Sequence, residues 1–225
     1  MMNPRFRDRQ EAGRELAEQL KRVLSSGTAR PNDRPLVLAL PRGGLPVAAE
    51  VAEELDADLD VLVVRKVGVP AHPELAMGAL AMLSGSIETV RNEMVLSQLP
   101  GAGEPGAAFD TVADKEREEL LRRDELYRQG RPPVQVDGRT VIVVDDGLAT
   151  GSTMKAALIA ARRFAPARLM AAIPVGARQT CRELEEFADD VIGTYVTDDL
   201  GSVGAAYRDF GQTSNEEVQE ILSRH

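Results

Sequence analysis

The sequence predicts an α/β fold in which an open, mostly parallel β-sheet carries helices on both faces. Short apolar runs alternate with amphipathic helical segments along most of the chain, and the connections between them are short. The predicted strands are apolar throughout instead of alternating with polar residues, which indicates that helices cover both of their faces. With 225 residues, the chain is long enough to bury a substantial hydrophobic core.

Each predicted element has a local signal in the sequence. The first helix, over residues 6–24, places Leu16 and Leu20 on one face and charged residues around them. The first strand, over residues 36–40, reads Leu-Val-Leu-Ala-Leu. A helix is then expected from Pro46, because proline is favoured in the first turn of a helix.

The remaining elements follow from the same periodicities. Strands are predicted over residues 61–64, 140–144, 168–175 and 190–195, with weaker patterns at 79–82, 87–90 and 134–136. Helices are predicted over residues 46–55, 110–129, 152–164, 178–187 and 215–222. Gly130 ends the long charged helix, and Thr213 or Ser214 is expected to cap the last one. The Gly- and Pro-rich residues 100–106 are expected to form a loop.

No domain boundary is visible, so we expect a single domain over residues 1–225. Its core is expected to cover about residues 35–195. The first helix, within residues 1–25, and the tail over residues 196–225 are the segments expected to form a small additional layer.

The composition restricts the class of protein. A formal net charge of −9 and a pI of 4.9 argue against a general nucleic-acid binder, which normally carries a basic surface. No apolar run approaches the roughly 20 residues that span a bilayer, and the N-terminus shows no apolar signal segment. The single cysteine, Cys181, fits a reducing compartment, or an extracellular protein without disulfide bridges. We therefore expect a cytoplasmic protein that binds neither nucleic acid nor membranes.

The most informative segment is residues 141–153, which reads V-I-V-V-D-D-G-L-A-T-G-S-T. An apolar strand leads to two carboxylates, then to a loop of small residues, then to a helix. Small side chains allow backbone N–H groups to converge on an anion, and the helix N-terminus adds positive potential. Ala149, Thr150, Gly151, Ser152 and Thr153 therefore form a candidate phosphate site. The alternative is an ordinary strand-to-helix turn.

Asp145 and Asp146 stand directly before this loop. Ionised carboxylates accept the hydroxyls of a ribose, and they also bind Mg²⁺ directly or through water. A phosphate loop beside two hydroxyl acceptors describes a site for a ribose 5-phosphate. The two commoner nucleotide motifs, G-x-x-x-x-G-K-[ST] and G-x-G-x-x-G after the first strand, are absent from the sequence.

This segment resembles the signature of the type I phosphoribosyltransferases. The resemblance implies that Asp145 and Asp146 hold the ribose hydroxyls of 5-phosphoribosyl 1-diphosphate, and that residues 149–153 hold its 5-phosphate. Gly147 departs from the family, which usually carries an aliphatic residue there, and we expect this glycine to loosen the loop. Further motifs, P-R-G-G, R-K-V-G-V-P and Y-R-D-F-G-Q-T-S, resemble a bacterial subgroup whose acceptor is unassigned.

The resemblance also implies roles outside the signature. Arg42, Gly43 and Gly44 follow the first strand, where the family binds diphosphate, and glycines there allow close backbone approach. Arg65 and Lys66 are expected to end the second strand at the same rim, and Lys66 is our choice for a diphosphate contact.

Two further segments resemble the covering parts of the family's site. Residues 67–78 resemble the mobile loop that closes over the reacting centre, with His72 and Glu74 as candidate general bases. Tyr207 and Phe210 lie in the tail that builds the family's hood, the small layer over the acceptor, so either ring is a candidate to stack on a flat acceptor.

The expected reaction displaces diphosphate from ribose C1 by a nitrogenous acceptor. The resemblance implies Mg²⁺ as cofactor, held mainly through the substrate and also by Asp145 and Asp146, and a homodimer as the assembly. Ala149 stands where the 6-oxopurine enzymes carry an acidic residue, which argues against a hypoxanthine or guanine acceptor. The alternatives are a non-catalytic module that senses phosphoribosyl diphosphate or nucleotides, and a phosphoribosyl-diphosphate synthase, whose chains are longer and carry two such domains.

Overall fold

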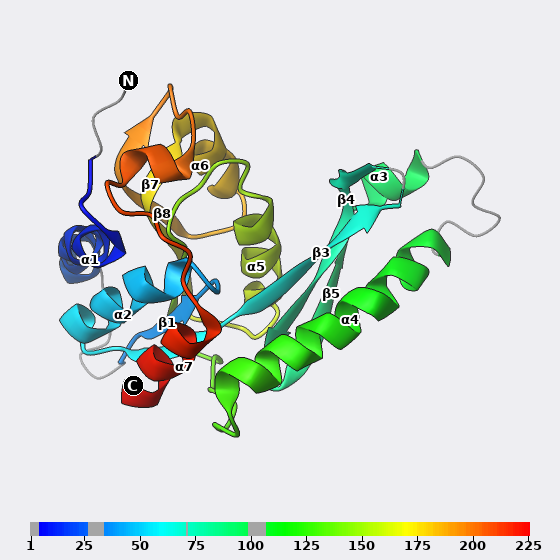
Figure 1. The fold of residues 1–225 in the computed structure, drawn as a ribbon, viewed down its shortest axis with the longest axis horizontal. Helices are drawn as coiled ribbons and strands as arrows, with labels where there is room; N and C mark the ends of the chain where they lie inside the picture. Colours follow the sequence, from blue (N-terminus) through cyan, green and yellow to red (C-terminus); the bar gives the residue numbers. More distant parts are fainter. Residues whose placement is uncertain (1–4, 27–33, 71, 99–106) are drawn as a thin grey trace.

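The computed structural model describes residues 5–26, 34–70, 72–98 and 107–225 (Figure 1). Its centre is a five-stranded sheet in the order β2-β1-β6-β7-β8, in which every neighbouring pair is parallel. The strands are β1 (Leu36–Ala39), β2 (Asp58–Val61), β6 (Thr140–Val144), β7 (Arg168–Ala177) and β8 (Asp190–Thr197). The predicted open, parallel sheet is therefore confirmed.

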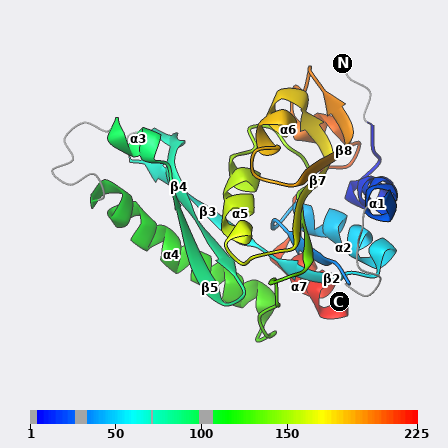
Figure 2. The same cartoon turned by 180° about the vertical axis from the view of Figure 1, so that it is seen from behind.

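Helices cover both faces of this sheet, as the apolar strands predict. One face carries α1 (Arg9–Ser26), α2 (Gly44–Leu55) and α7 (Asn215–Arg224), and the other carries α5 (Ser152–Arg162) and α6 (Arg178–Leu184) (Figures 1 and 2). Successive residues of a strand point to opposite faces. Val143 accordingly packs in the core beside α5 and α6, whereas Val144 packs in the core beside α1 and α2.

The strand register brings the ends of three strands to one edge of the central sheet. Ala39 pairs with Val61 on one side and with Val144 on the other. The backbone N–H of Leu40 then donates to the carbonyl of Val144 at 2.9 Å. The loops after β1 and β6 therefore leave the sheet side by side, at the edge where open parallel sheets bind ligands.

A second sheet, which the apolar runs of the sequence do not distinguish from the first, projects from one side of the molecule (Figures 1 and 2). Its strands are antiparallel, and two helices follow them: β3 (Val63–Val69), β4 (His72–Leu83), β5 (Ser86–Arg91), α3 (Glu93–Ser97) and α4 (Ala107–Arg128). The long helix α4 lies along β3 and β4, and buries Phe109, Ala113 and Leu120. We call residues 63–70, 72–98 and 107–128 the arm.

Two predictions in this region are wrong. The single strand predicted over residues 61–64 is divided, because β2 ends at Val61 and β3 begins at Val63. The residues around Leu62 are all buried, so hydrophobicity gives no sign of this break. The loop predicted over residues 67–78 is mostly strand: residues 67–69 belong to β3 and residues 72–78 belong to β4. Register shifts on both sides of Gly68 accommodate the Gly- and Pro-rich sequence within the ladder.

The strand predicted over residues 79–82 is present but much longer, since β4 begins at His72. The other predicted elements are confirmed with small changes at their ends, except one. The strand predicted over residues 134–136 is absent, and these residues have no regular structure. Val136 is nevertheless buried, so its apolar character reflects packing and not a strand. Ser214 is the cap of α7, and its hydroxyl accepts from the N–H of Glu217 at 3.1 Å. The loop predicted over residues 100–106 lies outside the described residues. None of the described helices has the length and apolar character needed to cross a membrane.

The N-terminal segment and the C-terminal tail pack against each other above the end of the central sheet. Phe6 forms a β-bridge with Tyr207, and both side chains join Ala12, Val175 and Ala206 in a small apolar cluster. The tail contributes the 3-10 helix η1 (Val203–Ala206) to this layer. We call residues 5–8 and 198–214 the hood.

Candidate functional site

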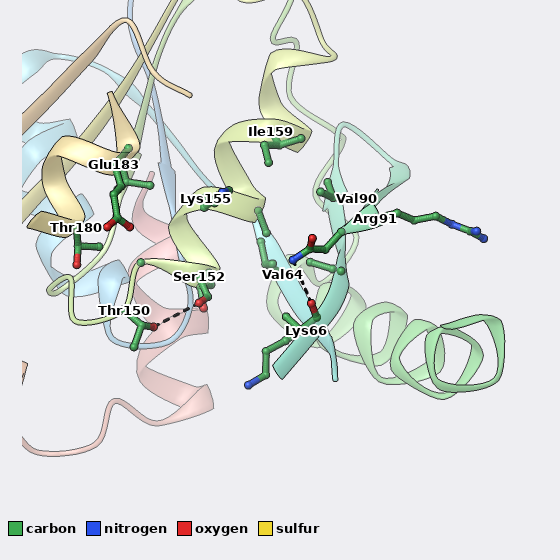
Figure 3. A pocket seen from close by; sticks show the side chains of 18 of the residues that line it. Val64, Lys66, Val90, Arg91, Thr150, Ser152, Lys155, Ile159, Thr180 and Glu183 are labelled. Carbon is green, nitrogen blue, oxygen red and sulfur yellow. Dashed lines mark hydrogen bonds between the residues drawn. The ribbon is translucent and has the colours of Figure 1, made fainter. Parts of the chain in front are cut away.

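The loop predicted to hold phosphate lies between β6 and α5 (Figure 3). Gly151 precedes the helix with a φ of 72°, and a Cβ atom added there would lie 2.5 Å from Thr180 Cγ2, so only glycine fits. Thr180 Oγ1 donates to the carbonyl of Ala149 at 2.8 Å and thereby fixes the loop to α6. The hydroxyls of Thr150 and Ser152 lie 3.4 Å apart at the N-terminus of α5, which favours anions.

The acidic pair lies directly before this loop, at the end of β6. Asp145 Oδ1 accepts a hydrogen bond from the backbone N–H of Asp146 at 2.8 Å. Burial raises the pKa of Asp145 well above its usual range, and the neighbouring charge of Asp146 raises it further. Burial also raises the pKa of Asp146, but Arg9 opposes this shift. The site thus concentrates two carboxylates in a partly desolvated position, where their negative charge is costly to keep.

Arg9, the first residue of α1, occupies one oxygen of this pair. Its Nε and Nη2 atoms donate to Asp146 Oδ2 at 2.9 and 2.8 Å, and Nη1 donates to the carbonyl of Gly211 at 2.7 Å. The guanidinium lies over the ring of Phe210, 3.9 Å from its centroid. A residue of the first helix therefore joins the acidic pair to the hood.

Gly147 does not loosen the loop as expected. A Cβ atom added there would lie 2.3 Å from Val203 Cγ1 and 2.8 Å from Val175 Cγ1. The next residue, Leu148, is tied to β7 through hydrogen bonds with Val175 and Ala177. The glycine instead allows η1 of the hood to pack closely against the loop, where an aliphatic side chain would collide with it.

The predicted diphosphate loop, which follows β1, touches the acidic pair. The peptide bond between Pro41 and Arg42 is cis. A Cβ atom added at Gly43 would lie 2.1 Å from Asp146 Oδ2, and one added at Gly44 would lie 2.8 Å from the carbonyl of Val144. Both glycines are therefore required by close contact with the chain after β6. The two ligand-binding loops predicted from the sequence are brought together by the structure.

The side chain of Arg42 also lies near the start of α7. The pKa of Glu216 is lowered by backbone and Ser214 hydrogen bonds, and additionally by the positive charge of Arg42. Arg42 itself is half-buried.

Arg65 and Lys66 lie within β3, and not at a strand end of the central sheet as predicted. Arg65 forms an ion pair with Glu116 of α4, with Nη2 2.6 Å from the carboxylate. Its charge is therefore paired within the arm, between β3 and α4. Lys66 is exposed and points to the other side of the strand, where it lines a pocket. Of the two, Lys66 alone lines the pocket beside the phosphate loop, and its contact with diphosphate stays a prediction.

The pocket that Lys66 lines has a volume of about 600 Å³. It lies between the phosphate loop with α5 on one side and the arm on the other (Figure 3). Thr150, Ser152 and Thr153 line it together with Lys155, and Val64 and Ile159 give it an apolar part. An anion on the phosphate loop therefore faces a lysine of the arm.

The two hood aromatics predicted to stack on an acceptor stack on each other, with ring centroids 4.9 Å apart. Tyr207 is buried, and its hydroxyl donates to the backbone carbonyl of Asp146 at 2.5 Å. Burial strongly raises the pKa of Tyr207, so this hydroxyl keeps its proton. Phe210 is 38% exposed, with Tyr207 and Arg9 against its ring. Stacking on an acceptor thus requires this packing to change.

The two candidate bases lie in β4 of the arm. His72 is exposed. The side chain of Glu74 lies outside the described part of the structure, so its role as a general base stays a prediction.

The acidic pair fits magnesium only in part. No group of three or more metal-binding side chains occurs among the described residues. Asp145 and Asp146 offer carboxylate oxygens, which Mg²⁺ prefers, but Oδ2 of Asp146 already accepts from Arg9. These residues fit an ion that takes most of its ligands from a bound diphosphate.

Comparison with known proteins identifies the family. A family model described as "Phosphoribosyl transferase domain" matches residues 6–207. The chain belongs to the phosphoribosyl transferase family. A Mycobacterium tuberculosis protein named "Putative phosphoribosyl transferase Rv0571c" is 42% identical over 219 residues, which cover 97% of this chain and 46% of that protein. The chain thus spans about half the length of this curated relative.

A solved structure shares the fold of this phosphoribosyl transferase-family chain. The crystal structure of the protein TT1426 from Thermus thermophilus matches with a TM-score of 0.83 and 40% sequence identity, over 98% of each chain. Because the match covers nearly the whole length, it includes the arm and the hood as well as the central sheet.

Sequence reasoning missed two residues at the site of this phosphoribosyl transferase-family protein. Arg9 stands 137 residues before Asp146, in a helix whose charged residues all look alike in one sequence. Thr180, which anchors the phosphate loop, begins no recognisable motif. The aspartates and the phosphate loop could be predicted because residues 145–153 are consecutive in the chain.

Proposed function

We propose that this protein transfers the 5-phosphoribosyl group of 5-phosphoribosyl 1-diphosphate to a nitrogenous acceptor and releases diphosphate. The observation that carries the proposal is the contact between the two loops after β1 and β6. Gly43 lies directly against the Asp146 carboxylate, beside the phosphate loop. A ligand that carries a 5-phosphate, a ribose diol and a diphosphate has a matching group for each part of this edge.

Each part of the substrate has a proposed partner. The 5-phosphate binds the N–H groups and hydroxyls of residues 149–153, and the ribose hydroxyls bind the acidic pair. The diphosphate binds the loop over residues 42–44, and Lys66 supplies positive charge from the arm. Asp145 and Asp146 would help to hold Mg²⁺ beside the diphosphate, where the ion would supply further positive charge to stabilise the departing group.

The proposed reaction is a displacement at ribose C1. The bond from C1 to the diphosphate oxygen breaks, and the electron pair leaves with the diphosphate. The acceptor nitrogen forms the new bond to C1 through an oxocarbenium-like transition state and then loses its proton. Asp145 and Asp146 position the ribose for this step. The base that takes the proton is proposed from the arm, where His72 and Glu74 remain the candidates.

The acceptor is proposed to be a base other than hypoxanthine or guanine, because Ala149 has no group to serve the purine ring. We further propose a cytoplasmic location, from the free and buried Cys181, and a homodimer, from the family. The longer relative carries a further half that this chain does not span, so the activity proposed here is that of the matched region.

Isothermal titration with 5-phosphoribosyl 1-diphosphate and Mg²⁺ tests the proposal. Wild type is expected to bind with a Kd on the order of micromolar, and Asp145→Asn/Asp146→Asn is expected to lose binding. The matched control is Asp198→Asn/Asp199→Asn, a second pair of adjacent carboxylates, which follows β8 and is exposed. A wild type that does not bind would overturn the proposal.

A screen for diphosphate release with a panel of bases then identifies the acceptor. Release with one base establishes the transferase reaction. Binding without release for any base would favour the alternative of a sensing module, which agrees with hood aromatics that stack on each other and leave neither ring free for an acceptor.

A further inference from the structure

Arg9 is built into the site more completely than an ordinary surface arginine. Its side chain and that of Asp146 are only 11% and 16% exposed. All three guanidinium nitrogens donate hydrogen bonds, two to Asp146 Oδ2 and one to the carbonyl of Gly211. The Phe210 ring covers the guanidinium face at 3.9 Å. A planar fork that bonds along its edges and stacks on its face is a role that lysine cannot fill.

Other ion pairs of the same helix differ from this one. Arg14, five residues further along α1, pairs with Glu50 of α2 at 2.8 Å, but its side chain is 45% exposed. Exposed pairs of this kind contribute little to a structure, whereas a desolvated pair persists only with good geometry and additional hydrogen bonds. Arg9 has the good geometry and the additional hydrogen bonds that a desolvated pair requires. Arg14 is largely solvated, so its pair with Glu50 has no such requirement.

The residue that Arg9 holds connects all parts of the site. The carboxylate of Asp146 lies against Gly43 of the diphosphate loop, and its backbone N–H donates to Asp145 Oδ1. Its backbone carbonyl accepts from Tyr207 of the hood. A change in the position of Asp146 therefore changes the position of Asp145 and the fit of the diphosphate loop together.

We propose that Arg9 is a positioning residue, which fixes the Asp146 carboxylate beside the diphosphate loop and so sets the acidic pair for the ribose diol. This inference rests on the proposed function. Arg9 uses Oδ2 of Asp146, which leaves Oδ1 and the Asp145 carboxylate as acceptors for the two ribose hydroxyls. Without Arg9, the Asp146 side chain loses both donors that orient it and faces the buried charge of Asp145 alone.

The diol contribution is measured by comparing two ligands. Titrations with ribose 5-phosphate and 2-deoxyribose 5-phosphate give a ratio of affinities. Because the two ligands differ only in the 2-hydroxyl, this ratio measures how much that hydroxyl contributes to binding. We expect a ratio of about 10 in wild type, the factor that corresponds to one hydrogen bond between a hydroxyl and a charged carboxylate. In Arg9→Met the ratio is expected to fall towards 1, and the affinity for phosphoribosyl diphosphate with Mg²⁺ to fall about 10-fold or more.

The controls separate positioning from a general loss of structure. Arg14→Met removes an arginine of the same helix and is expected to keep the wild-type ratio. A structural defect would weaken both sugar phosphates equally and leave their ratio unchanged. If Arg9→Met does not fold, Arg9→Lys keeps the charge without the fork, and its ratio is expected to lie between those of wild type and 1.

The outcomes are distinct from those for the proposed function. A wild-type ratio in both Arg9 variants, with binding of phosphoribosyl diphosphate intact, would overturn the role of Arg9 and leave the proposed function standing. A wild type that binds none of the three ligands would overturn the proposed function, and the role of Arg9 with it.

Discussion

At the scale of single residues, the acidic pair opposes stability at the place where it serves binding. Asp145 is desolvated at the end of β6 and stands beside the charge of Asp146, and both effects raise its pKa. A carboxylate in such a position is more costly in the folded than in the unfolded chain. Sites where local energetics are unfavourable are commonly functional sites.

Replacing Asp145 with asparagine is expected to stabilise the protein. The amide oxygen can still accept from the N–H of Asp146, so the variant removes the charge and keeps the hydrogen bond. We expect a gain of about 1 kcal/mol at pH 8, measured by urea unfolding without Mg²⁺. Asp198→Asn, at an exposed carboxylate, is the control and should change the stability by less than about 0.5 kcal/mol.

The gain should depend on pH in a defined direction. Because the folded pKa of Asp145 is raised, the folded state binds its proton more tightly than the unfolded state. Stability therefore falls as pH rises from the ordinary pKa of aspartate to the raised one, and the penalty is complete above it. The advantage of Asp145→Asn should shrink as the pH is lowered through this window. A constant advantage at all pH values would contradict the assignment.

The residue scale also shows what one sequence can reveal about a site. Residues 145–153 hold both aspartates and the phosphate loop in one continuous segment, so the sequence alone predicts a site for a ribose 5-phosphate there. Arg9 reaches the same site through tertiary structure, and nothing in its neighbourhood distinguishes it from the other arginines near the N-terminus. Gly147 looked like a weak point because the Val203 side chain that packs against it lies far along the chain.

At the scale of elements, the arm is joined to the central sheet by a buried ion pair. Arg128, in the last turn of α4, places Nη1 2.6 Å from Asp60 Oδ2, and their side chains are 8% and 3% exposed. Arg128 also bonds Asp124 and the carbonyl of Val61. This cluster lies where the chain passes from β2 to β3, so it fixes the point from which the arm departs.

Breaking this cluster on one side is expected to be severe. Arg128→Met leaves the Asp60 carboxylate buried without its partner, which costs about 3–5 kcal/mol in comparable cases. Replacing both partners, in Asp60→Leu/Arg128→Met, should recover a large part of that loss. Arg123→Met, at a half-exposed pair on the same helix, is the control. Urea unfolding measures all three, and a double variant as unstable as Arg128→Met would contradict the explanation.

The same region shows why element boundaries are harder to predict than elements. Residues 61–64 are one apolar run in sequence, and the change of sheet within it leaves no mark because Leu62 is as buried as its neighbours. Residues 67–78 carry glycines and prolines that are typical of loops, yet residues 67–69 belong to β3 and residues 72–78 to β4, and these two strands pair irregularly. Strands such as β6, whose ends are marked by polar residues, were predicted at their observed bounds.

At the scale of the whole molecule, the site is assembled from segments spread over the entire chain. It takes Arg9 from α1, residues 42–44 from the loop after β1, residues 145–153 from the loop after β6, and Tyr207 and Phe210 from the hood. Although the net charge of the chain is −9, cations gather at this edge: Arg9 bonds the acidic pair, Arg42 stands in the adjacent loop after β1, and Lys66 lines the pocket beside the phosphate loop. Ligand binding at one of these segments should therefore stabilise the others, although they are distant in sequence.

Hydrogen exchange with and without phosphoribosyl diphosphate and Mg²⁺ tests this coupling. A ligand that binds only the folded state suppresses local opening wherever its contacts, direct or through Asp146, hold the structure. We expect slower exchange in residues 41–46 and 145–155, and also in residues 5–12 and 203–213, which reach the site through Arg9 and Tyr207. Residues 185–197, which follow α6 and include β8, serve as the internal control. Protection confined to residues 145–155 would mean that the phosphate loop binds the ligand without engaging the diphosphate loop or the hood.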